Sequence, residues 1–332
     1  MTPSQKLRLA KRYTDNPEAY RLYLQGRYHF HKPSPEEQKM AIQYFEQALA
    51  LDPRHAPALA GMADAYYRLS FTGGLAPTEA IAKARQAAKK ALEIDEGLGE
   101  AHGPLAHIHS GYDRDYRAAE KEFQRALELN PSNAVTLRDY ALYLVHTGRP
   151  DESLHQIQRA LELDPLSSDA RQGMARIFMD RREFDSAVAQ SRRVIERDPT
   201  HYMAYTVLGA SLTAKQLYPQ AVAALEKACA LSGRHPVPLA SLGLALGAMG
   251  AKSEAEKILR ELQEMSSRRY VSPHHLATVC MGLGKKDQAI AWLERAYQER
   301  SLWLISITTD FRFDGLRSDP RFKAMLKKIG LP

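Results

Sequence analysis

The sequence predicts an all-α protein built from stacked helix pairs. Three observations predict it: a 34-residue period, small side chains two helical turns apart, and prolines at a fixed distance after them. The first is a recurring small or aliphatic residue, whose successive intervals are 43, 35, 34, 34, 34, 34 and 34 residues. A fixed period near this length is typical of helical repeats. The positions are Ala48, Ala91, Ala126, Ala160, Val194, Ala228, Leu262 and Ala296.

The second observation is another small residue seven positions earlier in each repeat. Seven residues span two helical turns, so both small side chains face the same way and let a neighbouring helix approach closely. These positions are Ala41, Ala84, Ala119, Ser153, Ala187, Ala221, Ala255 and Ala289. The third observation is a proline after Asp or Asn, five residues downstream of the first position. It predicts a helix end, because the residue before a proline is disfavoured in the helical region. These prolines are Pro53, Pro131, Pro165 and Pro199.

The other half of each repeat is predicted to be a second helix. It carries a further small residue about twelve positions before the small site of its partner helix, and an aromatic residue such as Phe184 often marks the turn. The repeat is therefore a helix, a turn and a helix. The small positions are Ala63, Ala106, Ala141, Ala175, Gly209, Gly243 and Ala277.

These small, aromatic and proline positions resemble the tetratricopeptide repeat, over about residues 17–301. The resemblance implies eight helix pairs in a right-handed α-solenoid, whose first helices line a concave groove. The physical expectation agrees, because one helix pair cannot bury its apolar face alone and stacked neighbours can.

Taken in order, the elements begin with a leader over residues 1–16. The first repeat is predicted to have a long turn at His31–Glu36. In the second repeat, Leu69–Thr78 is either a lengthened turn or an extended helix pair, since Gly73 and Gly74 supply loop residues. A phosphate-binding loop is excluded there, because no strand precedes the glycines and no Gly-Lys-Ser/Thr follows.

The C-terminal region, residues 302–332, is predicted to be a cap, which solenoids need to cover the last apolar face. A terminal helix over Pro320–Ile329 fits this role, because Phe322, Met325 and Ile329 are at helical spacing. The side chains predicted to fill the joint beneath it are Trp303, Leu304, Ile305 and Phe313.

The two ends of the sequence carry a narrower resemblance. The segments AKRYTDNPEAYRLYLQGRYHFHK and DFRFDGLRSDPRF are similar to the C-terminal repeat region of bacterial signalling proteins. In that group the repeats follow a serine/threonine kinase, a winged-helix regulator or a nucleotide cyclase. None of those domains is predicted in these 332 residues. The chain is either a free-standing relative or cut from a longer protein, and residues 1–16 then correspond to a linker.

Composition sets the broad class. A hydrophobic fraction of 44% and a charged fraction of 26% argue against a disordered chain. The longest nearly apolar stretch, Leu239–Ala251, is shorter than the roughly 20 residues that cross a bilayer, and no signal peptide is predicted. Two cysteines, Cys229 and Cys280, fit a reducing compartment as buried thiols. We therefore expect a cytoplasmic protein.

No chemistry-bearing motif stands out. His102, His107 and His109 lack the spacing of a zinc helix, so we expect no metal and no cofactor. No nucleophile motif is present, and an open solenoid groove excludes water poorly. These points predict a protein that is not an enzyme and has no small-molecule substrate.

The net charge of +7 makes nucleic acid a partner to consider, because nucleic acids are negatively charged. The basic residues cluster at Lys6–Arg12 and Arg321–Lys328, near the two ends, and elsewhere acids and bases alternate. Repeat proteins that read RNA base by base need the same polar pair in successive repeats, and the groove positions here vary. Nucleic-acid binding is kept as an alternative function.

Groove residues follow from the family resemblance, which places contacts at the second, fifth, ninth, twelfth and thirteenth positions of each first helix. The family's paired Lys and Asn for a terminal carboxylate are missing at the matching positions. The alternative to partner binding is that the groove charges only neutralise one another across neighbouring helices. The predicted partner-binding residues are Asp64, Tyr67, Arg68, Arg138, Leu142, His146, Asp169, Gln172, Arg176, Asp180 and Thr206.

The leading hypothesis is a protein-interaction module or scaffold of bacterial signalling, which binds a peptide or partner protein in its groove. A second hypothesis is a domain that regulates a kinase or transcription factor, in the same chain or in another. A third is self-association through an exposed terminal face.

Overall fold

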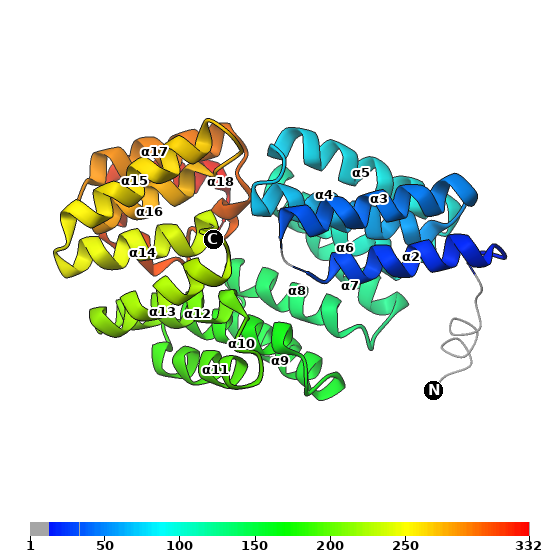
Figure 1. Ribbon diagram of the computed structural model, residues 1–332, viewed down its shortest axis with the longest axis horizontal. Coiled ribbons are helices and arrows are strands. Elements are labelled where there is room, and N and C mark those ends of the chain that lie inside the picture. Colours follow the sequence, from blue (N-terminus) through cyan, green and yellow to red (C-terminus); the bar gives the residue numbers. More distant parts are fainter. Residues whose placement is uncertain (1–12, 33, 332) are drawn as a thin grey trace. The chain divides into compact units, whose positions relative to one another are not determined.

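The computed structural model describes residues 13–32 and 34–331, and the described chain is all-α (Figure 1). Its α-helices form eight consecutive helix pairs and a final helix, which confirms the predicted fold class of an α-solenoid with a C-terminal capping helix. Residues 1–12 of the predicted leader, including the basic cluster Lys6–Arg12, lie outside the described residues.

The helix pairs of the first four repeats are α2 (Pro17–Phe30) with α3 (Pro35–Leu51), α4 (Ala56–Thr72) with α5 (Pro77–Ile94), α6 (Gly99–His107) with α7 (Tyr116–Leu129), and α8 (Ala134–His146) with α9 (Pro150–Leu163). Those of the last four are α10 (Ser168–Asp180) with α11 (Phe184–Arg197), α12 (Tyr202–Ala214) with α13 (Tyr218–Leu231), α14 (Pro236–Met249) with α15 (Lys252–Ser266), and α16 (Pro273–Gly282) with α17 (Lys286–Gln298).

The chain divides into two compact units, which we describe one at a time. The N-terminal unit comprises Met1–Ile108 and Ala118–Asn130, and the C-terminal unit comprises His109–Arg117 and Pro131–Pro332. In Figure 1 the helices of the first two repeats run from blue to cyan, and those of the last two from yellow to orange. In both units the two helices of a repeat pack against each other, for example α2 with α3, α4 with α5 and α8 with α9.

Helix ends follow local chemistry. Asn133 accepts hydrogen bonds from the N–H groups of Val135 and Thr136, which satisfies two donors at the start of α8. At the other end, Asp52 and Asp164 adopt non-helical backbone angles just before proline, so α3 and α9 end there as predicted.

The recurring small residues lie at helix contacts. Ala48, Ala91, Ala126 and Ala160 are fully or almost fully buried. In the N-terminal unit a Cβ atom added to Gly26 of α2 would lie 2.5 Å from the Phe45 ring of α3. The period therefore records the positions where helices approach most closely.

The first two repeats differ from the predicted turns. The prediction of a turn over His31–Glu36 is wrong at its end, because α3 begins at Pro35 and the Ser34 hydroxyl accepts a hydrogen bond at its N-terminus. In the second repeat the extended helix pair is correct, since α4 runs to Thr72 and α5 starts at Pro77. Gly73, with φ of 79°, ends α4 in the left-handed conformation, which lets the chain reverse within four residues.

A π-helix explains the single interval of 35 residues. It covers Ile108–Asp113, between Ala106 and Ala119, the small positions of the third repeat. A π-turn holds one more residue than an α-turn, so it adds one residue without disturbing the packing positions on either side.

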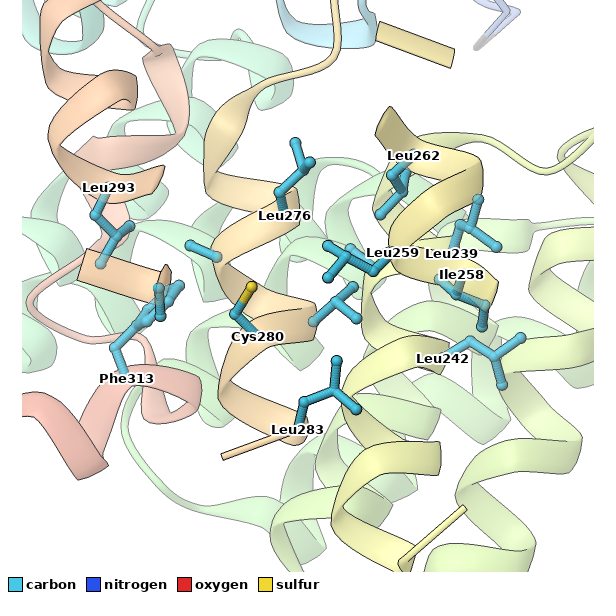
Figure 2. Packing of buried hydrophobic residues seen from close by; sticks show 14 of the residues in the cluster. Leu239, Leu242, Ile258, Leu259, Leu262, Leu276, Cys280, Leu283, Leu293 and Phe313 are labelled. Atoms are coloured by element: carbon cyan, nitrogen blue, oxygen red, sulfur yellow. The ribbon is translucent and has the colours of Figure 1, made fainter. Parts of the chain in front are cut away.

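The predicted capping helix is α18 (Pro320–Ile329), and its apolar residues Phe322, Met325 and Ile329 are buried. Two 3-10 helices precede it, η2 (Leu302–Ser306) and η3 (Phe311–Leu316). Trp303, Leu304 and Phe313 are buried as predicted, and Ile305 is half-buried. Figure 2 shows the Phe313 side chain near Leu293 of α17, in the layer that also holds Cys280 of α16.

Candidate functional site

The concave surface of the C-terminal unit is covered by residues 302–316 of the same chain, which we call the C-terminal segment. Phe311 of this segment stacks edge-on against Phe184, with ring centroids 5.6 Å apart, and packs against a buried cluster that includes the groove positions Met179 and Ala210. At a third groove position, the hydroxyl of Thr308 donates to the carbonyl oxygen of His146 at 3.5 Å. The segment thus contacts groove positions that were predicted to bind a partner.

A buried ionic network lies beneath the segment. The Asp180 carboxylate accepts from Arg176 Nε at 2.9 Å and lies 3.2 Å from His146 Nε2. On the segment, the Asp310 carboxylate binds the guanidinium of Arg312 through two contacts of 2.6 and 2.7 Å. One ionic group thus joins α8 to α10 and the other lies within the segment, and the Asp310 carboxylate acts electrostatically on Arg176.

Electrostatics keep this network charged although it is buried. Burial opposes ionisation of Asp180, but Arg176 and His146 outweigh it and hold the pKa of the carboxyl below its usual value. Burial also opposes charge on Arg176, and the carboxylates of Asp180 and Asp310 raise its pKa in spite of it. The pKa of Asp310 is held well below its usual value, against burial, chiefly by Arg312. Two arginines thus balance two carboxylates in the interior.

Two histidines of α16 complete the buried site. His274 Nε2 lies 3.4 Å from the Asp310 carboxylate, and its ring packs edge-on against Phe313 at 5.1 Å. His275 packs against Trp303 of the segment at 4.9 Å. Burial lowers the pKa of both rings, and that of His275 falls well below its usual value. Both rings therefore favour the neutral form inside the folded unit.

Residues 109–117 of the C-terminal unit contact α17 and α18, the helices before and after the segment. Arg114 lies over the Tyr297 ring at 4.1 Å, and the Tyr116 hydroxyl donates to the carbonyl oxygen of Ile329 at 3.1 Å. Arg182, two residues after the end of α10, pairs with Asp314 of the segment at 2.7 Å. The segment is thus tied to the unit by ionic, aromatic and hydrogen-bond contacts.

The structure separates the predicted groove residues into three sets. His146, Asp180 and Thr206 are buried, and Arg176 is half-buried with its guanidinium bound to Asp180. Near the start of the C-terminal unit, Arg138, Leu142, Asp169 and Gln172 reach the surface. The third set, in the N-terminal unit, is Asp64, Tyr67 and Arg68.

Charge neutralisation, the alternative to partner binding, accounts for some of the charged groove residues. Arg138 lies 2.7 Å from Asp139 and 3.9 Å from Asp169 on the next first helix. Arg176 pairs with Asp180 within α10. These contacts are structural, and a partner that used the charges would have to compete with them.

The concave surface of the N-terminal unit combines aromatic rings with cations. Arg68 of α4 lies over the Phe30 ring of α2 at 4.1 Å, and Arg27 approaches the same ring at 5.8 Å. Tyr67 stacks on the ring of His107 of α6 at 4.8 Å. Three successive first helices therefore contribute to one aromatic and basic surface.

Other candidate chemistry is not assembled. Within residues 13–32 and 34–331, no three His, Cys, Asp or Glu side chains gather as metal ligands. Of the histidines weighed for zinc, His102 pairs with Glu122 at 2.6 Å and His109 with Asp113 at 3.0 Å. In the basic cluster of α18, Arg321 is bound by Asp287 and Asp319, which neutralises part of its charge.

Both cysteines, Cys229 and Cys280, are buried and unbridged, as predicted. Burial raises the pKa of each thiol to about 11, so both remain protonated at neutral pH. Among the described helices, none is both long enough and apolar enough to span a bilayer.

The covering of the C-terminal unit was not predicted, yet the sequence holds a signal for it. Helices α12 and α14 carry no charged residue on any side, and groove positions such as Ala210, Val237 and Leu244 are apolar. A helix that is hydrophobic all round is buried all round. The apolar stretch Leu239–Ala251 therefore indicated a covered concave surface.

Comparison with known proteins identifies the family. Tetratricopeptide repeats match residues 111–171 and 173–236 in one form, and residues 36–55 and 274–300 in another. Together these ranges cover about half of the chain and fall on helix pairs of both units. The protein therefore belongs to the tetratricopeptide repeat proteins, a group whose fold generally serves as a protein-interaction scaffold.

Individual relatives are distant. The transcriptional regulator HilA of Salmonella typhimurium is 26% identical over 136 residues, which are 41% of this chain and 24% of that protein. Among solved structures, the human IFIT1 dimer with PPP-AAAA has a TM-score of 0.57 at 17% identity, over 80% of this chain and 69% of that one. Yeast Tom70 has a TM-score of 0.54 at 18% identity, over 95% and 69%. At these identities the structures show the fold alone.

Proposed function

We propose that the protein is a non-enzymatic interaction module of bacterial signalling or regulation, acting in the cytoplasm, and that the concave surface of its N-terminal unit binds a segment of a partner protein. The observation that carries the proposal is the pairing of rings and cations on α2, α4 and α6. Tyr67, Arg68 and His107 are half-buried, and the Phe30 ring beneath Arg68 is buried. The repeat fold, typical of interaction scaffolds, supports it.

The chemistry of this surface favours an extended partner segment with acidic and apolar side chains. Arg27 and Arg68 supply donors that suit carboxylates, and the half-buried rings of Tyr67 and His107 supply flat contact area. Asp64 lies on the same helix as Arg68 and adds an acceptor that discriminates between partners. A helical groove of this kind binds through a few anchor side chains.

Arg138, Leu142, Asp169 and Gln172 form the second part of the proposal. They lie near the start of the C-terminal unit, where the concave surface reaches solvent. We assign the buried groove positions of this unit, by contrast, to its own C-terminal segment. A partner of this unit would therefore contact α8 and α10 and not the helices that follow.

A random peptide library displayed on phage tests the proposal with the intact protein. Enriched peptides are synthesised, and their affinity is measured by fluorescence anisotropy. The variant carrying Tyr67→Ala and Arg68→Glu should bind at least about tenfold more weakly, a loss of about 1.4 kcal/mol. Arg260→Glu, an exposed charge change on α15, is the matched control and should bind like the wild type. Equal affinity in all three proteins would place the binding elsewhere.

A second candidate function is regulation of a transcription factor, in the same chain or in another. It is favoured by the 26% identity to a stretch of the transcriptional regulator HilA. A bacterial two-hybrid assay against winged-helix and kinase proteins encoded beside this gene would separate the two functions. Interaction with such a neighbour, lost in the Tyr67→Ala and Arg68→Glu variant, would favour regulation over a general scaffold.

A further inference from the structure

The first helix of the third repeat, α6, contains residues that weaken a helix. Gly103 and Pro104 follow one another in its interior, and they are the two residue types that a helix tolerates least. The helix has only nine residues and is followed directly by the π-helix η1. A π-turn next to an α-helix is frequently found at a functional site. The side of α6 that carries Gly103 is therefore a place to expect a function beyond packing.

The backbone of α6 is open to the surroundings at Gly103. A Cβ atom added to this residue would meet nothing within 4 Å beyond its own helix, and the residue is half-buried. For every other glycine in the described helices, the nearest atom to such a Cβ lies between 2.4 and 3.3 Å away. These crowded glycines are Gly26, Gly61, Gly99, Gly111, Gly173, Gly209, Gly243, Gly247, Gly282 and Gly315.

Pro104 accounts for the glycine but not for the open space. A Cβ atom on the residue before a proline crowds the proline ring when the backbone is helical, and glycine avoids this clash. A neighbouring helix could nevertheless fill the space, as the Phe45 ring of α3 does above Gly26 and Gly61. In the described part of the chain nothing fills it above Gly103, and we call this space the Gly103 hollow.

The Gly103 hollow lies at a groove position of the N-terminal unit. Counted from the small residue Ala106, Gly103 is the fifth position of the first helix and His107 the ninth. They are one helical turn apart and therefore on the same side of α6. The His107 ring stacks on Tyr67 of α4 at 4.8 Å and packs edge-on against the buried ring of Phe123 at 5.5 Å. A flat pair of rings, supported by a buried one, thus stands one turn from the hollow.

The charges of this surface favour an apolar occupant of the hollow. Glu100, three residues before Gly103, is exposed on the same side of α6. The two arginines of the surface, on α2 and α4, lie instead at the Phe30 ring. A carboxylate of the partner is therefore attracted to Phe30 and repelled by Glu100, which leaves the hollow to a side chain without negative charge.

The chain's own C-terminal segment shows what kind of side chain such a groove accepts. In the C-terminal unit, its Phe311 ring packs edge-on against Phe184 and against a buried cluster that includes the groove residue Ala210. An aromatic ring of the occupant there meets a small groove residue beside an aromatic side chain of the solenoid. A ring in the Gly103 hollow, beside His107, would repeat this arrangement.

We propose that the Gly103 hollow receives one large apolar side chain of the partner, aromatic rather than aliphatic, which packs over the backbone of α6 and against His107. The inference rests on the proposed function, because it assigns an anchor within the same concave surface. Gly103 is then a specificity-determining residue, since any side chain at this position would take the place of the anchor. A single buried aromatic anchor commonly supplies much of the affinity of a peptide.

Gly103→Leu tests the proposal with the peptides that phage display enriches on the intact protein. Filling the hollow should weaken their binding at least about tenfold in fluorescence anisotropy. Ala50→Leu is the matched control, because it adds a similar side chain at an exposed position of α3 in the same unit, and it should bind like the wild type. Gly103→Ala is measured as well, since a large residue before Pro104 can disturb α6. It should weaken binding by a smaller factor, and the circular dichroism spectrum should be unchanged.

An alanine scan of the best peptide identifies the anchor. Replacing the anchor by alanine should cost at least about tenfold in affinity for the wild type but less than about threefold for Gly103→Leu, in which the hollow is already filled. The anchor should be Phe, Tyr or Trp. A critical peptide residue that is small or charged would overturn the proposal.

The variants also separate this proposal from the function on which it rests. Peptides that lose affinity with Tyr67→Ala and Arg68→Glu, but bind both Gly103 variants like the wild type, would overturn the anchor and leave the proposed function standing. Equal binding to all of these variants would overturn both.

Discussion

Arg176 donates to the carboxylate of Asp180 at 2.9 Å, one helical turn further along α10, and the Asp180 side chain is only 1% exposed. Both residues occupy groove positions, where a solenoid of this type would meet a partner. Here they face the chain's own C-terminal segment, whose Asp310 adds a second carboxylate to the electrostatic environment of Arg176. The pair is therefore an interior ion pair whose main effect is on stability.

Asp180→Ala is expected to destabilise the C-terminal unit by about 3–5 kcal/mol, because it leaves the Arg176 guanidinium buried without its main partner. The only two tryptophans of the chain, Trp292 and Trp303, lie in this unit, so tryptophan fluorescence during urea unfolding reports on it. Asp169→Ala is the matched control, since that side chain is 61% exposed, and should change stability by less than about 0.5 kcal/mol. Similar effects in both variants would contradict an interior role for Asp180.

The close approach of α2 to α3 at Gly26 gives a second prediction. Gly26→Ala places a Cβ atom against the buried Phe45 ring, which has no room to move because Gly61 contacts its other side. Overpacking of this kind costs about 1–3 kcal/mol. Thermal unfolding followed by far-ultraviolet circular dichroism should therefore show a lower midpoint.

Phe45→Leu provides the control for Gly26→Ala. The smaller side chain leaves room for the added methyl group, so the double variant should be more stable than the sum of the two single effects predicts. Simple additivity would show that the two residues are not in contact.

Much of the fold could be predicted because its signals are local. Ala126 and Ala160 recur at a fixed period since helices can approach closely only at small side chains, and Pro53 or Pro165 ends a helix whatever lies beyond it. The same logic located α18 through Phe322 and its neighbours. Around Gly73 the sequence was compatible with either a lengthened turn or an extended helix pair. The structure has the extended pair, because α4 and α5 pack against each other along their length.

The candidate site was harder to predict because it depends on contacts between distant residues. Groove positions could be assigned by register, but whether they face solvent depends on the path of the chain. Contacts such as Phe184 with Phe311 follow from how far the repeats turn in space, which no single repeat encodes. The sequence alone does not distinguish the surface pair Arg138 and Asp169 from the buried pair Arg176 and Asp180. All four are charged residues at groove positions, although their environments in the structure differ.

The two thiols provide a third prediction. Cys229 and Cys280 are buried, and burial raises the pKa of each to about 11, so little thiolate is available at pH 8. Reaction with Ellman's reagent should be slow in the native protein and rapid for both thiols in urea. Cys229→Ala and Cys280→Ala assign each phase to one residue. Fast reaction of either thiol under native conditions would show that its helix opens readily.

The last prediction concerns acid and the two buried histidines of α16. Burial lowers the pKa of His274 and His275, so the folded unit holds both rings neutral at a pH where the unfolded chain, with a pKa near 6.5, already binds protons. The unfolded state is therefore favoured as the pH falls below about 6.5, and the two rings contribute no pH dependence well above that value. Asp180 and Asp310 affect stability in a lower pH range. Because their pKa values are lowered in the folded unit, both carboxylates stabilise the fold above about pH 4, and this stabilisation is lost only as the pH falls further.

Urea unfolding followed by tryptophan fluorescence at pH 7.5, 6.5 and 5.5 measures this effect. Each histidine that stays neutral in the fold reduces the free energy of unfolding by up to about 1.4 kcal/mol per pH unit below its unfolded pKa. His275→Gln removes one of these groups, so stability should fall less steeply between pH 6.5 and 5.5 than in the wild type. The variant also loses the ring contact with Trp303, so it should be less stable at pH 7.5, where neither ring titrates. An unchanged slope would mean that His275 takes up a proton inside the folded unit, which its burial beside His274, His235 and Arg312 opposes.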